Sequence, residues 1–280
     1  MSVAPRVQDL DARLRALPGA VVAFSGGVDS SALLHACARV LGARVLAVTA
    51  DSPSLPRVEL DDARALASVL GVRHLVVKTR ELARHAYRRN DADRCYHCKT
   101  ELFAVIESEL RGLPEAAWPV LYGAIGDDLT DHRPGARAAA EHGVRAPLAE
   151  AGWRKEEVRA YCRTHGLSVA EKPSFACLAS RVPYGTAVDA GVLGRVEAAE
   201  AVLRALGYAQ FRVRHHGDVA RVELRPEDIA RAAARDRERI ALGIRAAGYA
   251  YVALDLIGYR TGSLNEVLAA APPAAGIMDP

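Results

Sequence analysis

A short glycine- and serine-rich stretch, Ser25–Ser31, carries the clearest chemistry in the sequence and reads Ser-Gly-Gly-Val-Asp-Ser-Ser. It follows an apolar run, Ala20–Phe24, and precedes a segment whose apolar residues recur at helical spacing. Two glycines let the backbone approach a ligand closely, and the start of a helix offers unpaired N–H groups and the positive end of a dipole. This combination is typical of a phosphate-binding loop.

The stretch lacks the lysine of a Walker-type loop. We therefore expect backbone amides and serine hydroxyls to hold a nucleoside triphosphate, together with a magnesium ion that Asp29 helps to bind. The competing interpretation is a glycine pair in an ordinary strand–helix turn. The candidate nucleotide-binding residues are Ser25, Gly26, Gly27, Asp29, Ser30, Ser31 and, at the end of a later strand, Gly123.

Cysteines provide the second group of reactive side chains. Cys95 and Cys98 form a Cys-x-x-Cys pair at the start of a predicted helix, whose dipole favours the thiolate. Zinc, an iron–sulfur cluster, a redox pair or two inert thiols would each fit this pair taken alone. Cys37 and Cys162 lie on apolar helix faces, so we expect both in the core.

Cys177 lies in a loop, residues 171–186, that two prolines and a glycine keep from forming one long helix. Ser180 and Arg181 are close in sequence, and a cationic neighbour lowers a thiol pKa and can hold an anionic substrate. Cys177 is therefore the best candidate nucleophile, against the alternative of a small buried residue.

Charged residues mark two further places. Arg212 and Arg214 alternate along a predicted strand and share one face, which suits phosphate binding, although a solvated basic edge is the commoner arrangement. Asp127, Asp128 and Asp131 follow a predicted strand and could hold Mg²⁺ or orient a substrate. A solvated acidic turn is the alternative for these carboxylates.

The elements that must position these residues alternate between strand and helix over the first half of the chain. Such alternation is typical of a doubly wound parallel sheet, in which strand ends face the ligand crevice. We predict one domain over residues 1–148 and a smaller α+β domain over 149–280. The predicted strands are 20–24, 44–50, 72–78, 118–125, 210–214, 219–224 and 251–257, and the main helices are 58–70, 95–110, 137–142, 155–165, 190–206 and 226–247.

Composition narrows the class of protein. The 280 residues hold 37 basic and 34 acidic side chains, a net charge of +3 without the basic block of a dedicated nucleic-acid binder. No apolar run reaches the ~18 residues of a membrane helix. Five cysteines, an odd number, favour metal or catalytic thiols in a reducing compartment over a disulfide framework. We expect a cytoplasmic protein.

Three motifs together resemble the LarE family of ATP-dependent sulfur transferases, within the ATP-pyrophosphatase (PP-loop) superfamily. They are Ser25–Ser30, Cys95–Lys99, and Lys172-Pro with Ala176–Thr186, and the likeness runs from about Gly19 to Ile257. The resemblance implies that ATP adenylates a carboxylate of pyridinium-3,5-biscarboxylic acid mononucleotide. Sulfur then replaces the adenylate, twice in all, on the way to the nickel-pincer nucleotide cofactor of lactate racemase.

Cys177 matches the essential cysteine of the family. In family members that have only this cysteine, the cysteine transfers its own sulfur to the substrate and is itself converted to dehydroalanine. Because this chain also has Cys95 and Cys98, the resemblance implies a [4Fe-4S] cluster on all three, with one iron open to carry an extra sulfide. The resemblance further implies a hexamer. It also implies that the substrate phosphate is bound by Ser180, Arg181, Arg212 and Arg214, and that a divalent metal or the substrate is bound by Glu200 and Glu223.

Two other functions compete with this one. Some tRNA thiolases of the same superfamily combine a pyrophosphate loop with three cluster-bound cysteines. A chain of net charge +3 without a stripe of basic residues, however, would attract the phosphates of RNA only weakly. A non-catalytic nucleotide-binding or zinc-binding module, with structural Cys95 and Cys98, is the second alternative.

Overall fold

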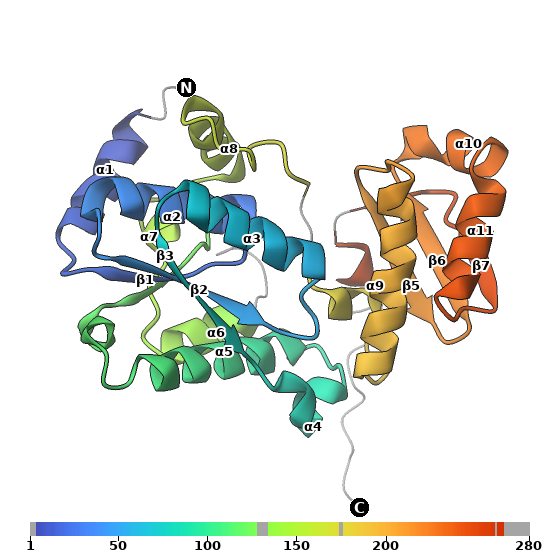
Figure 1. Ribbon diagram of the computed structural model, residues 1–280, viewed down its shortest axis with the longest axis horizontal. Coiled ribbons are helices and arrows are strands. Elements are labelled where there is room, and N and C mark those ends of the chain that lie inside the picture. Colours follow the sequence, from blue (N-terminus) through green and yellow to red (C-terminus); the bar gives the residue numbers. More distant parts are fainter. Residues whose placement is uncertain (1–3, 128–133, 174–175, 261, 266–280) are drawn as a thin grey trace, which may run out of the picture. The chain divides into compact units, whose positions relative to one another are not determined.

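The computed structural model describes residues 4–127, 134–173, 176–260 and 262–265. The chain forms two compact units, which we call unit 1 (Met1–Cys177) and unit 2 (Leu178–Pro280) (Figure 1). Of the predicted acidic cluster, Asp128 and Asp131 lie outside the described residues.

Unit 1 is built on a four-stranded sheet in the order β3-β2-β1-β4, and every pairing is parallel. The predicted parallel α/β fold is confirmed. The strands are β1 (Ala20–Ala23), β2 (Val45–Asp51), β3 (Arg73–Lys78) and β4 (Val120–Tyr122). The helices are α1 (Ala4–Arg15), α2 (Val28–Leu41), α3 (Arg57–Val69), α4 (His85–Arg88), α5 (Arg94–Leu110), α6 (Pro134–Glu141), α7 (Pro147–Glu150) and α8 (Lys155–Thr164), with short 3₁₀ helices η1 (Glu81–Ala83) and η2 (Pro114–Ala117).

The core of unit 1 has a layer on each face of the sheet. Side chains of β1 alternate between the layers: Val22 packs in one with Leu33 of α2, and Val21 packs in the other with Phe103 of α5. Figure 1 shows α1, α2 and α8 on one side of the sheet and α5 and α6 on the other. Because helices cover both faces, the strands are nearly continuous apolar runs.

Unit 1 extends past residue 148, where the sequence places the domain boundary. The reason is that α8 packs against α2, and Trp153, Val158 and Cys162 are fully buried in the same core as Leu33. Cys37 is also fully buried in this core. The prediction that Cys37 and Cys162 are core residues is therefore confirmed.

Unit 2 has a three-stranded sheet in the order β5-β6-β7. β5 and β6 form an antiparallel hairpin that turns at Gly217, whose φ of +64° favours glycine, and β7 joins β6 in parallel. The strands are β5 (Phe211–His216), β6 (Val219–Leu224) and β7 (Tyr251–Leu254). The helices are α9 (Ala190–Ala205), α10 (Pro226–Ala234) and α11 (Arg237–Ala246), with 3₁₀ helices η4 (Leu178–Arg181) and η5 (Ser263–Asn265).

The predicted helix over residues 226–247 is wrong in one respect, because it is broken into α10 and α11. Asp236 lies at the break and is only 3% exposed. Its carboxylate accepts hydrogen bonds from the Tyr208 hydroxyl (2.9 Å) and from Arg231 Nε (3.0 Å). The break between the two helices places the buried Asp236 carboxylate next to these donors, which satisfy its hydrogen-bonding needs.

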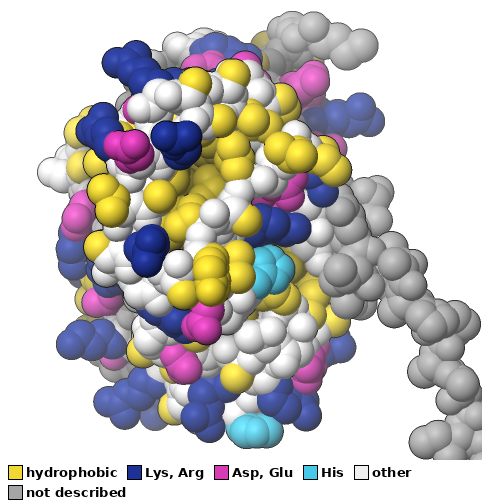
Figure 2. Space-filling view, turned by 90° about the vertical axis from the view of Figure 1, so that its right-hand side faces the viewer, with side chains coloured by type: hydrophobic (Ala, Val, Ile, Leu, Met, Phe, Trp, Pro, Cys, Tyr) yellow, Lys and Arg dark blue, Asp and Glu magenta, His cyan; other side chains and the backbone are white. Residues whose placement is uncertain are grey.

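One side of unit 2 exposes large apolar side chains. Figure 2 looks onto the side where Figure 1 shows α10, α11 and β7, and hydrophobic side chains gather there around a hollow. Among the described residues of unit 2, the exposed large hydrophobic side chains are those of Leu242, Tyr251, Leu256 and Ile257. None of the helices in the described ranges is both long and apolar enough to cross a membrane.

Candidate active site

The Ser25–Ser31 stretch forms the predicted strand–loop–helix turn between β1 and α2, and its serines hold the loop together. The hydroxyls of Ser25 and Ser30 lie 3.1 Å apart, and Ser30 Oγ donates to the Gly27 carbonyl (3.1 Å). The Ser25 amide donates to Ser30 Oγ (3.3 Å). Ser31 Oγ is buried and has no hydrogen-bond partner among the described residues. The loop is therefore already shaped by its own hydrogen bonds.

Two glycines are required by close packing at this loop. Gly26 has a φ of +71°, and a Cβ on it would lie 3.2 Å from the Cβ of Ala63. A Cβ on Gly123, just after β4, would lie 2.6 Å from the Ser30 amide nitrogen. The end of β4 thus abuts the first turn of α2 directly, and any side chain at Gly123 would displace the loop.

Asp29, the predicted metal-binding carboxylate, carries an ion pair. Lys155 Nζ lies 2.7 and 2.9 Å from its two carboxylate oxygens. The backbone amide of Lys155 donates to Asp127 Oδ2 (2.9 Å). Asp127 at the end of β4 and Asp29 on the loop are thus joined through the start of α8, and a cation that binds Asp29 would compete with this ammonium.

A second lysine also reaches the loop. Lys172 Nζ lies 2.8 Å from both Glu59 and Asp62 of α3, and 3.4 Å from the Gly26 carbonyl oxygen. Burial alone would lower the pKa of Lys172, but the hydrogen bonds and charges of Asp62 and Glu59 outweigh burial and raise it. Sequence reasoning missed both Lys155 and Lys172, although they are two of only four lysines in the chain.

The two cysteine motifs come within electrostatic reach of each other in unit 1. Burial raises the pKa of the Cys98 thiol to about 12, and the charges of Cys177, Glu81 and Cys95 add to this effect. Burial and the charges of Cys177 and Cys98 likewise raise the pKa of Tyr87. Cys98 and Cys177 are half-buried, whereas Cys95 is exposed. These three thiols therefore share one neighbourhood.

The surroundings of Cys98 are polar and buried. Glu81 accepts hydrogen bonds from Ser54 Oγ (3.3 Å) and from Ser52, which follow β2. Its other carboxylate oxygen and the Tyr87 hydroxyl are buried without a hydrogen-bond partner in the described part of the chain. Within these residues, no group of three His, Cys, Asp or Glu side chains is arranged to hold a metal ion.

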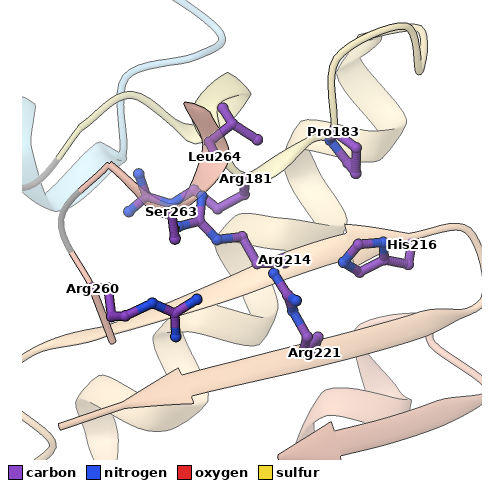
Figure 3. Close-up of a pocket in the computed structure, with 8 residues that line it drawn as sticks. All are labelled: Arg181, Pro183, Arg214, His216, Arg221, Arg260, Ser263 and Leu264. Atoms are coloured by element: carbon purple, nitrogen blue, oxygen red, sulfur yellow. The ribbon is translucent and has the colours of Figure 1, made fainter. Parts of the chain in front are cut away.

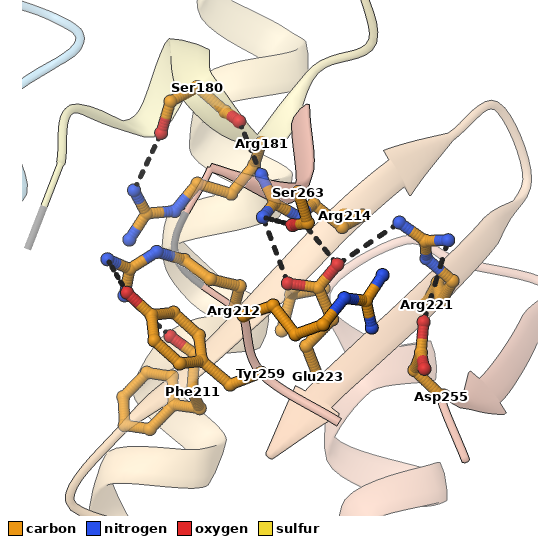
Figure 4. A network of polar contacts seen from close by, with 12 residues as sticks. Ser180, Arg181, Phe211, Arg212, Arg214, Arg221, Glu223, Asp255, Tyr259 and Ser263 are labelled. Atoms are coloured by element: carbon orange, nitrogen blue, oxygen red, sulfur yellow. Dashed lines mark hydrogen bonds and ion pairs between the residues drawn. The ribbon is translucent and has the colours of Figure 1, made fainter. Parts of the chain in front are cut away.

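The three predicted phosphate-binding arginines of unit 2 are buried; Arg181 and Arg214 pair with carboxylates, whereas Arg212 donates to the Phe211 carbonyl (2.7 Å). Arg181 is fully buried and makes two hydrogen bonds to Glu200 (2.8 and 3.0 Å). Arg214 makes two to Glu223, both 2.9 Å, and also donates to the Ser180 carbonyl (2.7 Å). Figure 4 shows the second of these pairs within a wider polar network. Glu200 and Glu223 thus orient arginines.

Positive charge is nonetheless in excess at this place. Burial, with the charge of Arg181, lowers the pKa of Arg212 to about 10, so this guanidinium stays charged at neutral pH. Burial and the charges of Arg221 and Arg214 lower the pKa of His216. Arg181, Arg214 and Arg221 pair with Glu200, Glu223 and Asp255, and the described part of this region also contains Arg212 and Arg260.

A pocket of about 170 Å³ opens among these arginines (Figure 3). Its volume is several times the ~30 Å³ share of one water, so a phosphate-sized anion fits. Sequence reasoning found Arg181 and Arg214 but not the other lining cations, which come from the next strand and from the chain after β7. The lining residues are Arg181, Pro183, Arg214, His216, Arg221, Arg260, Ser263 and Leu264.

Comparison with known proteins gives the family of the chain. The asparagine synthase family model matches residues 8–103, which contain the Ser25–Ser31 loop. An uncharacterized protein of Synechocystis sp. is 43% identical over 257 residues, 90% of this chain and 94% of that protein. Pyridinium-3,5-bisthiocarboxylic acid mononucleotide synthase of Lactiplantibacillus plantarum is 36% identical over 271 residues, 96% of this chain and 97% of that protein. With its PP-loop fold and near-complete coverage of that enzyme, the chain belongs to the LarE family of ATP-dependent sulfur transferases.

Proposed function

We propose that this enzyme converts carboxylates of pyridinium-3,5-biscarboxylic acid mononucleotide to thiocarboxylates, the chemistry that the name of the Lactiplantibacillus relative describes. The observation that carries the proposal is the position of Cys177. Cys177 belongs to unit 1, which also holds the pyrophosphate loop, so the proposed sulfur donor and the proposed ATP site lie in the same unit.

In the first step a substrate carboxylate oxygen attacks the α-phosphorus of ATP. The bond from that phosphorus to its bridging oxygen breaks, and pyrophosphate leaves. The amides and hydroxyls of the Ser25–Ser31 loop bind the departing phosphates at the start of α2, with Gly123 backing the loop. Asp29 would help to hold the Mg²⁺ that accompanies ATP while sharing its carboxylate with the Lys155 ammonium.

In the second step a sulfur nucleophile attacks the activated carbonyl carbon, and AMP leaves. If the nucleophile is the Cys177 thiolate, a thioester forms. Loss of the Cys177 α-proton with cleavage of its Cβ–Sγ bond then leaves dehydroalanine, and the thiocarboxylate keeps the sulfur. This route consumes the enzyme.

Cys95, Cys98 and Cys177 fit a [4Fe-4S] cluster in the chemistry of their donors, because all three are thiols, and both Cys95 and Cys177 contribute to the raised pKa of Cys98. They would hold it through three thiolates. When bound, such a cluster supplies an open iron that carries a replaceable sulfide, so that Cys177 is not consumed. We propose this catalytic version for the chain, since both added cysteines lie in the neighbourhood of Cys177.

The arginine pocket of unit 2 takes the phosphate of the mononucleotide in this proposal. Arg181 and Arg214, which line the pocket, supply the main donors, with Arg212 and Ser180 next to them, and Glu200 and Glu223 hold Arg181 and Arg214 in place. A divalent metal at the glutamates would have to displace their arginine partners. We further propose that copies of unit 2 assemble the chain into a hexamer, and that the thiols act in the reducing cytoplasm.

The test is to purify the protein without oxygen beside its Cys95→Ala variant, to measure iron and sulfide, and to record the mass of Cys177 peptides after turnover with ATP and substrate. A brown wild type that loses its colour in the variant, with Cys177 intact after several turnovers, is the expected result. A colourless protein that loses H₂S from Cys177 would establish the sacrificial route instead. Absence of pyrophosphate release with the mononucleotide would overturn the function itself.

A further inference from the structure

The loop that carries Cys177 also carries an ammonium to the pyrophosphate loop. Lys172 Nζ lies 3.4 Å from the carbonyl oxygen of Gly26, a residue 146 positions earlier in the chain. Arg159 of α8 fixes the Lys172 backbone by donating to its carbonyl (3.0 Å) and to that of Ala170. Since α8 packs on α2, this backbone is tied to the helix whose start forms the loop.

The pyrophosphate loop itself supplies no cation. Its own residues, Ser25–Ser31, offer amides, hydroxyls and one carboxylate. The triphosphate of ATP carries several negative charges, and amides alone leave most of them uncompensated. Of the two lysines that reach the loop, Lys155 is held by both oxygens of Asp29.

We propose that Lys172 binds the β- or γ-phosphate of ATP and so takes the place of the Walker lysine that the loop lacks. This inference rests on the proposed function, whose ATP site it completes.

A phosphate oxygen can replace one of the present hydrogen-bond acceptors of Lys172 at a small cost in free energy. Glu59 is nearly buried and acts as the permanent anchor, whereas the Asp62 side chain is 51% exposed. An exposed ion pair contributes only ~0–1 kcal/mol. The contact with the Gly26 carbonyl, at 3.4 Å, is a long hydrogen bond. A phosphate oxygen can therefore replace either acceptor while Glu59 keeps the ammonium charged and in place.

The experiment compares equilibrium binding of Mg-ATP, pyrophosphate and AMP to the full chain by calorimetry. We expect Lys172→Met to weaken ATP and pyrophosphate at least tenfold and to leave AMP within about twofold, and Lys172→Arg to retain most of the ATP affinity. Arg163→Ala is the matched control, because Arg163 pairs with Glu171 beside Lys172 at the surface. It should change none of the three affinities.

Asp62→Asn separates phosphate binding from a purely structural brace. If Lys172 binds phosphate, removal of a competing acceptor frees the ammonium, and ATP binds more tightly relative to AMP. If Lys172 only braces α3 against its own loop, the same variant weakens ATP and AMP alike, which would overturn the inference. A wild type that binds no ATP overturns the proposed function too, whereas ATP affinity unchanged in Lys172→Met overturns this inference alone.

Discussion

Buried ion pairs make the stability of unit 2 sensitive to single substitutions. Arg181 and Glu200 are both almost completely buried, and each is compensated by the other. Taking a pair of ions out of water is costly, and removing one partner leaves the other uncompensated. The pair therefore does more to define the geometry of the pocket than to stabilise the unit.

We expect Glu200→Gln to lower the free energy of unfolding by about 3–5 kcal/mol, because the Arg181 guanidinium then lies buried beside a neutral amide. Denaturant unfolding measures the change. Adding Arg181→Met should recover much of the loss. Glu238→Gln on the exposed face of α11 is the control, expected within ~0.5 kcal/mol of wild type. A single variant as stable as this control would contradict the prediction.

Two neighbouring imidazoles of unit 1, His35 and His165, have ring centroids 4.7 Å apart and make the stability of the unit depend on pH. Burial, then His165 and Arg39, lower the pKa of His35, and burial with Arg39 lowers that of His165. Below the unfolded value of ~6.5, the unfolded chain binds more protons than the folded one. This contribution is therefore fully present above about pH 6.5 and is lost as the pH falls.

Unfolding at pH 7.5 and at pH 5.5 should show this loss, and His35→Gln should reduce the difference between the two values. His85→Gln provides the control, since His85 is exposed at the start of α4. An equal pH dependence in His35→Gln and wild type would show that the imidazole pair is not its source.

At the scale of elements, the contact between β4 and α2 decides the shape of the pyrophosphate loop. We expect Gly123→Ala to weaken ATP binding at least tenfold and to destabilise the fold by ~1–3 kcal/mol, because its Cβ would overlap the Ser30 backbone. Calorimetry and denaturant unfolding measure the two effects.

The matched substitution is Gly194→Ala. Gly194 is exposed within α9, and a Cβ there meets nothing within 4 Å. Alanine should stabilise the helix by about 0.5–1 kcal/mol, since glycine is a poor helix former. Equal ATP affinity in Gly123→Ala and wild type would rule out the close packing described above.

At the scale of the whole molecule, the apolar side of unit 2 is the surface suited to bind another copy. β7 lies at the edge of its sheet, and Leu256 and Ile257 are 86% and 67% exposed. An edge strand with apolar neighbours invites pairing with a further chain. We therefore propose this surface as the contact between copies of the chain.

We expect Leu256→Asp with Ile257→Asp to reduce the molar mass seen by light scattering, because two carboxylates would be desolvated in the contact. Val69→Asp, at an equally exposed apolar residue of unit 1, should leave the mass unchanged. A double variant that keeps the wild-type mass would place the interface elsewhere.

Much of the molecule follows from local sequence. The apolar run Ala20–Phe24, the glycine pair and the helical spacing after them predict β1, the loop and α2, because strand, turn and helix signals act over a few residues. The apolar spacing of Cys37 and Cys162 predicts their burial. The long helix predicted over 226–247 fails at Asp236, whose carboxylate finds Tyr208, a donor outside that local pattern.

Only the tertiary structure decided which residues that are far apart in the sequence come into contact. Lys155 and Lys172 reach the pyrophosphate loop because α8 packs on α2, and the same contact moves the end of unit 1 to Cys177. The sequence by itself determined most of the elements and the strand–loop–helix turn at Ser25–Ser31, and it predicted Cys177 as the nucleophile. It could not pair Arg181 with Glu200 or bring Cys98 toward Cys177, since such contacts depend on how whole elements pack and not on any nearby residue.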